Sequence, residues 1–175
     1  MVNISSILLT FIGLFIATLY DLKNRRIPNL LTISMTLAGF INSFINKGFV
    51  SLGEHVLAFL IGFIFYFLFY LIGAFGAGDV KLIASLGAIM GLKFILIASI
   101  LILLVGGIIS FMILLKNNGL LYIASLLKNT FRLLFTRNMT QMKKNAVRSE
   151  RNSYPYTIAI VAGSLMTIWY IYSIS

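Results

Sequence analysis

The chain has 175 residues, of which 60% are hydrophobic and only 10% are charged. Soluble domains are about a quarter charged, so this composition excludes an aqueous fold and indicates an integral membrane protein. The sequence contains no cysteine and a single histidine, which excludes disulfides, a thiolate metal site and a cysteine nucleophile. We therefore expect one membrane domain over residues 1–175, without a metal or another cofactor.

Apolar runs separated by short polar segments predict an all-α fold with six transmembrane helices. The expected spans cover residues 4–20, 30–45, 56–72, 79–90, 94–115 and 154–174. The first is close to the lower limit of ~17 residues for crossing the hydrocarbon, and the fourth is shorter than that limit. Between the second and third spans, residues 46–55 are expected to form a turn.

Residues 116–153 form the one long polar loop. Within it, residues 120–137 place their polar and basic side chains on one helical arc and leucine and phenylalanine on the rest. An interfacial helix is favoured over a seventh span, because Lys128 and Arg132 would otherwise lie in the membrane interior. The inserted alternative stays open.

The basic residues predict the orientation of the chain. With six spans, Lys47 and Lys93 lie on one side, and the other twelve of the fourteen basic residues lie opposite. These twelve are Lys23, Arg25, Arg26, Lys81, Lys116, Lys128, Arg132, Arg137, Lys143, Lys144, Arg148 and Arg151. The positive-inside rule then places both termini outside and the long loop in the cytoplasm. Topology and anionic lipid headgroups explain the net charge of +10 without a nucleic acid partner.

Two of the four acidic residues fall on this cytoplasmic face: Asp21 after the first span and Asp79 at the start of the fourth. Taken singly, each has a structural explanation. Asp79 is suited to capping a helix N-terminus, and Asp21 to pairing with Arg25 four residues later. Glu54 falls on the opposite face beside the histidine, where both suit an ordinary turn.

Taken together, Asp21 and Asp79 suggest chemistry. Two carboxylates held close in a low-dielectric site cannot both ionise easily, so one keeps a proton. One member then takes a proton from water while the other protonates a carbonyl oxygen, which suits metal-free hydrolysis of a peptide bond. The sequence does not determine which aspartate plays which role. Gly76 and Gly78 suit close approach of backbone to a substrate or tight helix packing.

Three motifs carry a resemblance to a known family. The stretch Asp21-Leu-Lys-Asn-Arg-Arg-Ile-Pro-Asn29, followed by Gly76-Ala-Gly-Asp-Val-Lys81, resembles the type IV prepilin peptidases, which are GxGD aspartic membrane proteases. Residues 154–160, Tyr-Pro-Tyr-Thr-Ile-Ala-Ile, resemble the last-helix motif of that family. The resemblance implies that the chain cleaves leader peptides from prepilin-like proteins at the cytoplasmic face of the cell membrane.

By motif position, the resemblance assigns Asp21 and Asp79 as the catalytic pair. Supporting or substrate-binding positions are Arg25, Arg26, Pro28, Asn29, Gly76, Gly78, Lys81 and Pro155. Bifunctional members of the family carry an N-terminal portion with paired cysteines that is linked to N-methylation. This chain starts directly with a span and lacks cysteine, so we expect a peptidase of the short branch without methyltransferase activity.

The short branch includes peptidases of tight-adherence pili and archaeal preflagellin peptidases, and the sequence does not choose between them. The alternative to an enzyme is a small scaffold or transport component. In that case the aspartates would form salt bridges with Arg25, Arg26 or Lys81.

Overall fold

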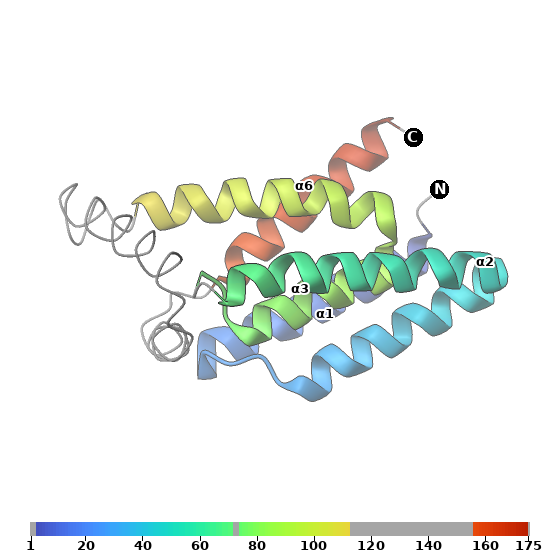
Figure 1. Ribbon diagram of the computed structural model, residues 1–175, viewed down its shortest axis with the longest axis horizontal. Coiled ribbons are helices and arrows are strands. Elements are labelled where there is room, and N and C mark those ends of the chain that lie inside the picture. The colour runs from blue at the N-terminus through green and yellow to red at the C-terminus, as the bar shows by residue number, and fades with distance from the viewer. Residues whose placement is uncertain (1–2, 72–73, 113–155, 175) are drawn as a thin grey trace.

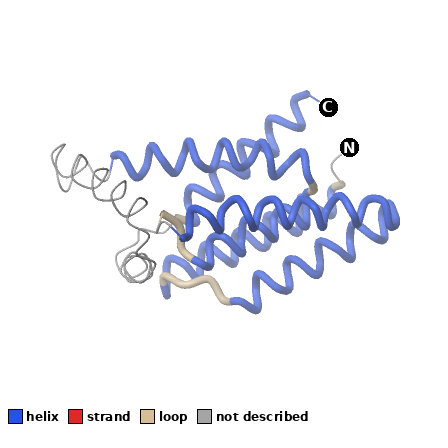
Figure 2. Tube along the Cα trace, viewed as in Figure 1, coloured by secondary structure: helices blue, strands red, loops and turns tan. Residues whose placement is uncertain are grey.

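The computed structural model describes residues 3–71, 74–112 and 156–174. Within these ranges the chain is helical with short connections and no strand (Figure 2), which confirms the predicted all-α class. The expected loop 116–153, its amphipathic helix 120–137 and Pro155 lie outside the described residues.

The described chain folds back and forth as one helical bundle (Figure 1). Helix α1 covers Ile4–Asn24, α2 covers Asn29–Leu71, α3 covers Ala77–Met90 and α6 covers Thr157–Ile174. A further helix covers Leu92–Met112. Three helical segments are long and apolar enough to cross a bilayer, namely Ile4–Asn24, Gly48–Leu71 and Leu92–Met112. The chain is thus a membrane protein, and the count of six spans stays a prediction.

The turn expected over residues 46–55 is much shorter than predicted. Helix continues through this segment except at Gly48, where the backbone adopts φ 70° and ψ −160° and α2 folds back on itself. A positive φ of this kind is open to glycine at little cost. One glycine therefore makes the reversal, and the polar residues after it, including Glu54 and His55, belong to the following helix.

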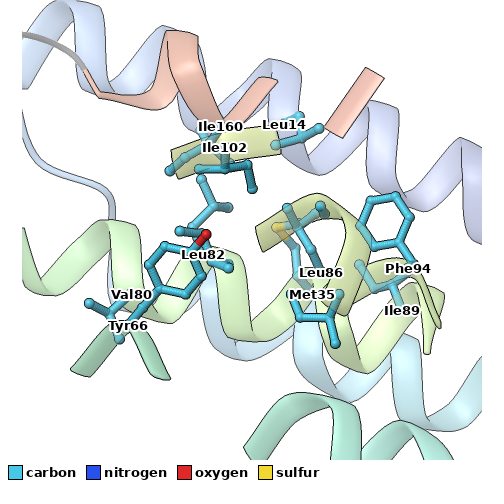
Figure 3. Close-up of a cluster of buried hydrophobic side chains, with 14 of the residues drawn as sticks. Leu14, Met35, Tyr66, Val80, Leu82, Leu86, Ile89, Phe94, Ile102 and Ile160 are labelled. Atoms are coloured by element: carbon cyan, nitrogen blue, oxygen red, sulfur yellow. The ribbon is translucent and has the colours of Figure 1, made fainter. Parts of the chain in front are cut away.

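Helix α3 forms the centre of the bundle, and every residue from Leu82 to Ile89 is buried. A helix that is buried all round must be apolar or small on every face, which the sequence of this segment satisfies. Its side chains pack against Leu14, Met35, Tyr66, Ile102 and Ile160, which come from all the other helices (Figure 3). The central part of α3 is thereby enclosed by the other helices.

Glycines bring α2 against α3 on both arms of its hairpin. A Cβ atom added to Gly39 would lie 2.7 Å from the carbonyl oxygen of Ala88, and one added to Gly87 would lie 2.7 Å from that of Ala58. Small residues allow this backbone approach in membrane helices, where dispersion contacts drive association. The two arms of α2 are therefore packed directly on the central helix.

The bundle has two distinct ends (Figure 1). Both termini lie at the end that contains the Gly48 bend and the Gly91 turn, which we call the termini end. The last turn of α1 and the first turns of α3 and α6 lie at the opposite end, which we call the site end. Asp21 and Asp79 are therefore both at the site end.

Candidate functional site

Asp21 lies within the last turn of α1 rather than after it. The helix continues to Asn24, and Arg25 ends it in the left-handed conformation (φ 50°, ψ 34°) with its N–H donating to the Asp21 carbonyl at 2.8 Å. The Asp21 side chain is only 8% exposed, whereas Lys23 and Arg25 are exposed. The end of α1 therefore places a carboxylate inside the bundle and basic groups outside it.

The Asp21 carboxylate is bound by the first residue of α6. The Thr157 hydroxyl donates to Asp21 Oδ2 at 2.5 Å across a sequence separation of 136 residues. Hydroxyl-to-carboxylate bonds of about 2.5–2.7 Å are charge-assisted and among the stronger hydrogen bonds in proteins. This contact fixes α6 to the last turn of α1.

Asp79 occupies the third helical position of α3, and Gly76 is the N-cap. The backbone N–H of Gly76 donates to Asp79 Oδ2 at 3.2 Å, so the carboxylate satisfies a helix-terminal N–H. The sequence suggested Asp79 itself as the N-cap residue, which is wrong by three positions. A negative charge in the first turn is also favoured by the helix dipole.

The segment that follows α1 packs along the Gly76–Asp79 turn. A Cβ atom added to Gly78 would lie 3.2 Å from the Ile27 Cβ, so the two backbones are in close approach. The Lys81 ammonium donates to Asn29 Oδ1 at 2.8 Å. Two motifs separated by about fifty positions in the sequence, at Ile27–Asn29 and Gly78–Lys81, are thus joined side by side.

Tyr156 completes the arrangement from the segment that leads into α6. Its ring lies 4.5 Å from the Phe75 ring between centroids, and its hydroxyl interacts electrostatically with Asp79. The same hydroxyl abuts Gly106 of the Leu92–Met112 helix, where a Cβ atom would overlap it. Thr157 therefore binds Asp21, and the preceding residue, Tyr156, is within electrostatic range of Asp79.

The structure separates the sequence-predicted site residues into two groups. It brings together Asp21, Asp79, Gly76, Gly78, Lys81 and Asn29 at the site end. Pro28 precedes α2, and its carbonyl accepts from the first N–H groups of that helix. Arg25 and Arg26 are exposed, and Pro155 lies outside the described residues.

Sequence reasoning missed Tyr156, Thr157 and Ile27 as parts of the site. Tyr156 and Thr157 stand inside the proline-aromatic stretch that the resemblance singled out, so their position was flagged but their contacts were not. A threonine hydroxyl carries no signal of a distant partner, because its usual partner is a carbonyl in its own helix.

Within residues 3–71, 74–112 and 156–174, the pairing with Arg25 that the sequence suggested for Asp21 is not found. No ion pair between Asp21 and Arg25 is formed there, since the left-handed Arg25 leaves the helical register in which i and i+4 side chains meet. Lys81 bonds an amide oxygen instead of a carboxylate. The described ranges also hold no group of three histidine, cysteine or acidic residues suited to binding a metal ion.

The fold and this arrangement define a class: a helical membrane protein with two aspartates at one end of its bundle. A family model described as the Type IV leader peptidase family matches residues 8–111, which include Asp21 and Asp79. Because this match covers more than half of the chain, the protein belongs to the Type IV leader peptidase family.

Two curated relatives agree with this family. The chain is 39% identical over 83 residues to a preflagellin peptidase of Methanocaldococcus jannaschii, which covers 45% of the chain and 35% of the relative. It is 33% identical over 124 residues to a prepilin leader peptidase/N-methyltransferase of Aeromonas hydrophila, which covers 66% of the chain and 42% of the relative. The chain thus aligns with less than half the length of each relative. No solved structure matches it.

Proposed function

We propose that the protein is an aspartic endopeptidase that removes leader peptides from prepilin-like or preflagellin-like proteins, with Asp21 and Asp79 as its catalytic pair. One observation supports the proposal most directly: the buried Asp21 carboxylate accepts a hydrogen bond from Thr157 at the start of α6, and the neighbouring Tyr156 is within electrostatic range of Asp79. Both carboxylates are therefore proposed to act together at the site end.

The chemistry needs only water and the two carboxylates. An ionised aspartate accepts a proton from water as the water oxygen bonds to the scissile carbonyl carbon, and a protonated aspartate donates its proton to the carbonyl oxygen. The resulting tetrahedral diol then collapses. Its C–N bond breaks and the leaving amine takes a proton, which regenerates the carboxyl pair.

The substrate class rests on the family and on the names of the two relatives. A prepilin-like substrate has a short basic leader followed by a hydrophobic helix, as the family resemblance implies. The outer faces of α1 and α2 expose many large apolar side chains that lipid covers, and the same environment solvates the hydrophobic helix of a substrate.

The site end is proposed to face the cytoplasm. Lys23, Arg25, Arg26 and Lys81 flank that end among the described residues, and Lys93 lies beside the Gly91 turn at the other end. The positive-inside rule orients such a bundle with its basic end inward, where anionic headgroups stabilise it. Under this proposal, cleavage takes place at the inner face of the cell membrane and both termini lie outside.

The test is cleavage of a synthetic prepilin-like substrate, a basic leader joined to an apolar helix, by the full chain in proteoliposomes. Asp21→Asn and Asp79→Asn, each alone, are expected to lower cleavage by at least about a thousandfold, since removing one member of a catalytic unit disables the whole unit. Glu54→Gln, an acidic residue at the termini end, is the matched control and should cleave normally. Cleavage at wild-type rates in either aspartate variant would refute the catalytic pair.

A further inference from the structure

The six threonines in the described residues fall into two classes. Five of them donate their hydroxyl to a carbonyl in their own helix three or four residues back, namely Thr10, Thr18, Thr32, Thr36 and Thr167. Thr157 is the exception, because its hydroxyl reaches a different helix and binds a carboxylate. As the first residue of α6, it has no carbonyl of its own helix behind it to bind.

The Thr157 to Asp21 contact is also shielded from solvent. Thr157 is fully buried at 0% exposure and Asp21 is 8% exposed. The hydroxyl donates to Oδ2 at 2.5 Å, and no second side-chain donor to Asp21 is found among the described residues. One carboxylate oxygen is therefore fixed, and Oδ1 is the oxygen left to engage a water molecule.

We propose that Thr157 is a positioning residue that orients the Asp21 carboxylate, so that Asp21 is the member of the pair that accepts the proton from water. This inference rests on the proposed function and assigns the roles that the sequence leaves open. The Thr157 hydroxyl holds Oδ2 at 2.5 Å and leaves Oδ1 to engage the water molecule.

The step that follows from this assignment is balanced in atoms and charge. The water proton passes to Asp21 Oδ1, the water oxygen bonds to the scissile carbonyl carbon, and the carbonyl oxygen takes the proton of Asp79. Other charged and titratable groups at this end of the bundle, from α1, α2, α3 and the start of α6, are Tyr20, Lys23, Arg25, Arg26, Tyr70, Asp79, Lys81 and Tyr156. A substitution at position 157 replaces none of these side chains.

The experiment compares Thr157→Val, which keeps the side-chain shape and removes the hydroxyl, with Thr157→Ser, which keeps the hydroxyl. Both are assayed for cleavage of the synthetic prepilin-like substrate across pH. Thr157→Val is expected to lower kcat by about 10- to 100-fold, the range for loss of a hydrogen bond to a charged group. The loss should appear in kcat more than in KM, because the hydroxyl orients the base and does not bind the substrate. Thr157→Ser should keep the wild-type kcat and the wild-type pH–rate profile.

Thr167→Val is the matched control, since Thr167 is equally buried in the same helix but bonds only the Gly163 carbonyl. It should cleave like wild type. If Thr157→Val does not insert or fold, Thr157→Ala is compared with the same serine variant instead.

The outcomes separate this inference from the proposed function. Wild-type kcat and pH profile in Thr157→Val, with Asp21→Asn inactive, would overturn the role of Thr157 and leave the peptidase assignment intact. Equal losses in the valine and serine variants would overturn it too, since the hydroxyl would then be irrelevant. Activity in Asp21→Asn would instead overturn the proposed function itself.

Discussion

The two ends of the bundle use polar side chains in different ways. At the termini end, imidazole, hydroxyl and carbonyl groups join neighbouring helices: His55 Nδ1 lies 2.8 Å from the Ala88 carbonyl oxygen, and the Ser43 and Ser51 hydroxyls lie 2.9 Å apart across the Gly48 bend. At the site end, the bonds join segments from the beginning, middle and end of the chain, as in the contact between Thr157 and Asp21. Both ends contain acidic residues, yet only the site end buries one.

The comparison shows why carboxylates alone do not identify a site. Glu54 is exposed beside a turn, where water and headgroups solvate it at little cost. Asp21 is buried, and the Thr157 hydroxyl donates to it from another helix. This buried carboxylate distinguishes the site end from the termini end among the described residues, and the variants below test that distinction.

The largest effect is expected from separating the two motifs at the site end. Gly78→Val would insert side-chain atoms where a Cβ alone already lies 3.2 Å from the Ile27 Cβ, so α3 and its aspartate should shift relative to α1. A displacement of about 1 Å in a catalytic group can lower activity by about a hundredfold. We expect a loss of that order in the proteoliposome cleavage assay.

Gly53→Val is the control for this substitution, since a Cβ at Gly53 meets no atom within 4 Å. The double variant Gly78→Val/Ile27→Ala should recover part of the activity, because it removes the atoms that collide. Full activity in Gly78→Val would show that the contact between the two motifs is not needed.

The next largest effect is expected from the middle of the bundle, between the two ends. Gly87→Val would force a side chain into the Ala58 carbonyl, and overpacking of this kind costs about 1–3 kcal/mol. The thermal midpoint of unfolding in detergent should fall, with cleavage reduced only as the folded fraction falls. A normal midpoint would mean that α2 and α3 do not approach as closely as the structure has them.

A smaller effect is expected from the termini end. His55→Phe removes the bond to the Ala88 carbonyl, and the loss of a typical hydrogen bond costs about 1 kcal/mol. The thermal midpoint should fall slightly while kcat for the synthetic substrate is unchanged. A selective loss of cleavage at normal stability would contradict the division of the molecule into two ends.

The smallest effect is expected at the rim of the site. Lys81→Met and Asn29→Ala each break the 2.8 Å bond between these side chains, which are partly or fully exposed. Each should lower cleavage by no more than about threefold, since exposed polar contacts are weak. The double variant should lose no more than either single one, because all three remove the same contact. Strictly additive losses would show that the two residues act independently.

Much of the fold could be predicted because a lipid environment requires long apolar segments separated by polar ones. Within the described residues, the predicted apolar runs lie in helices, and the largest difference is the helix that extends back from Val56 to the Gly48 bend. That error has a clear cause: a cluster of polar residues resembles a turn, yet a single glycine with positive φ was sufficient to reverse the chain.

The sequence by itself determined that the chain is a membrane protein and that its charges favour one orientation. It also determined which two aspartates lie at the ends of helices on one face. These properties depend on the composition and order of the residues, because each segment inserts into the bilayer according to its own hydrophobicity and flanking charge. Only the tertiary structure decided that α3 is enclosed by the other helices and that Arg25 turns away from Asp21. It alone brought Thr157 to that carboxylate, because a contact across 136 residues depends on how whole helices pack.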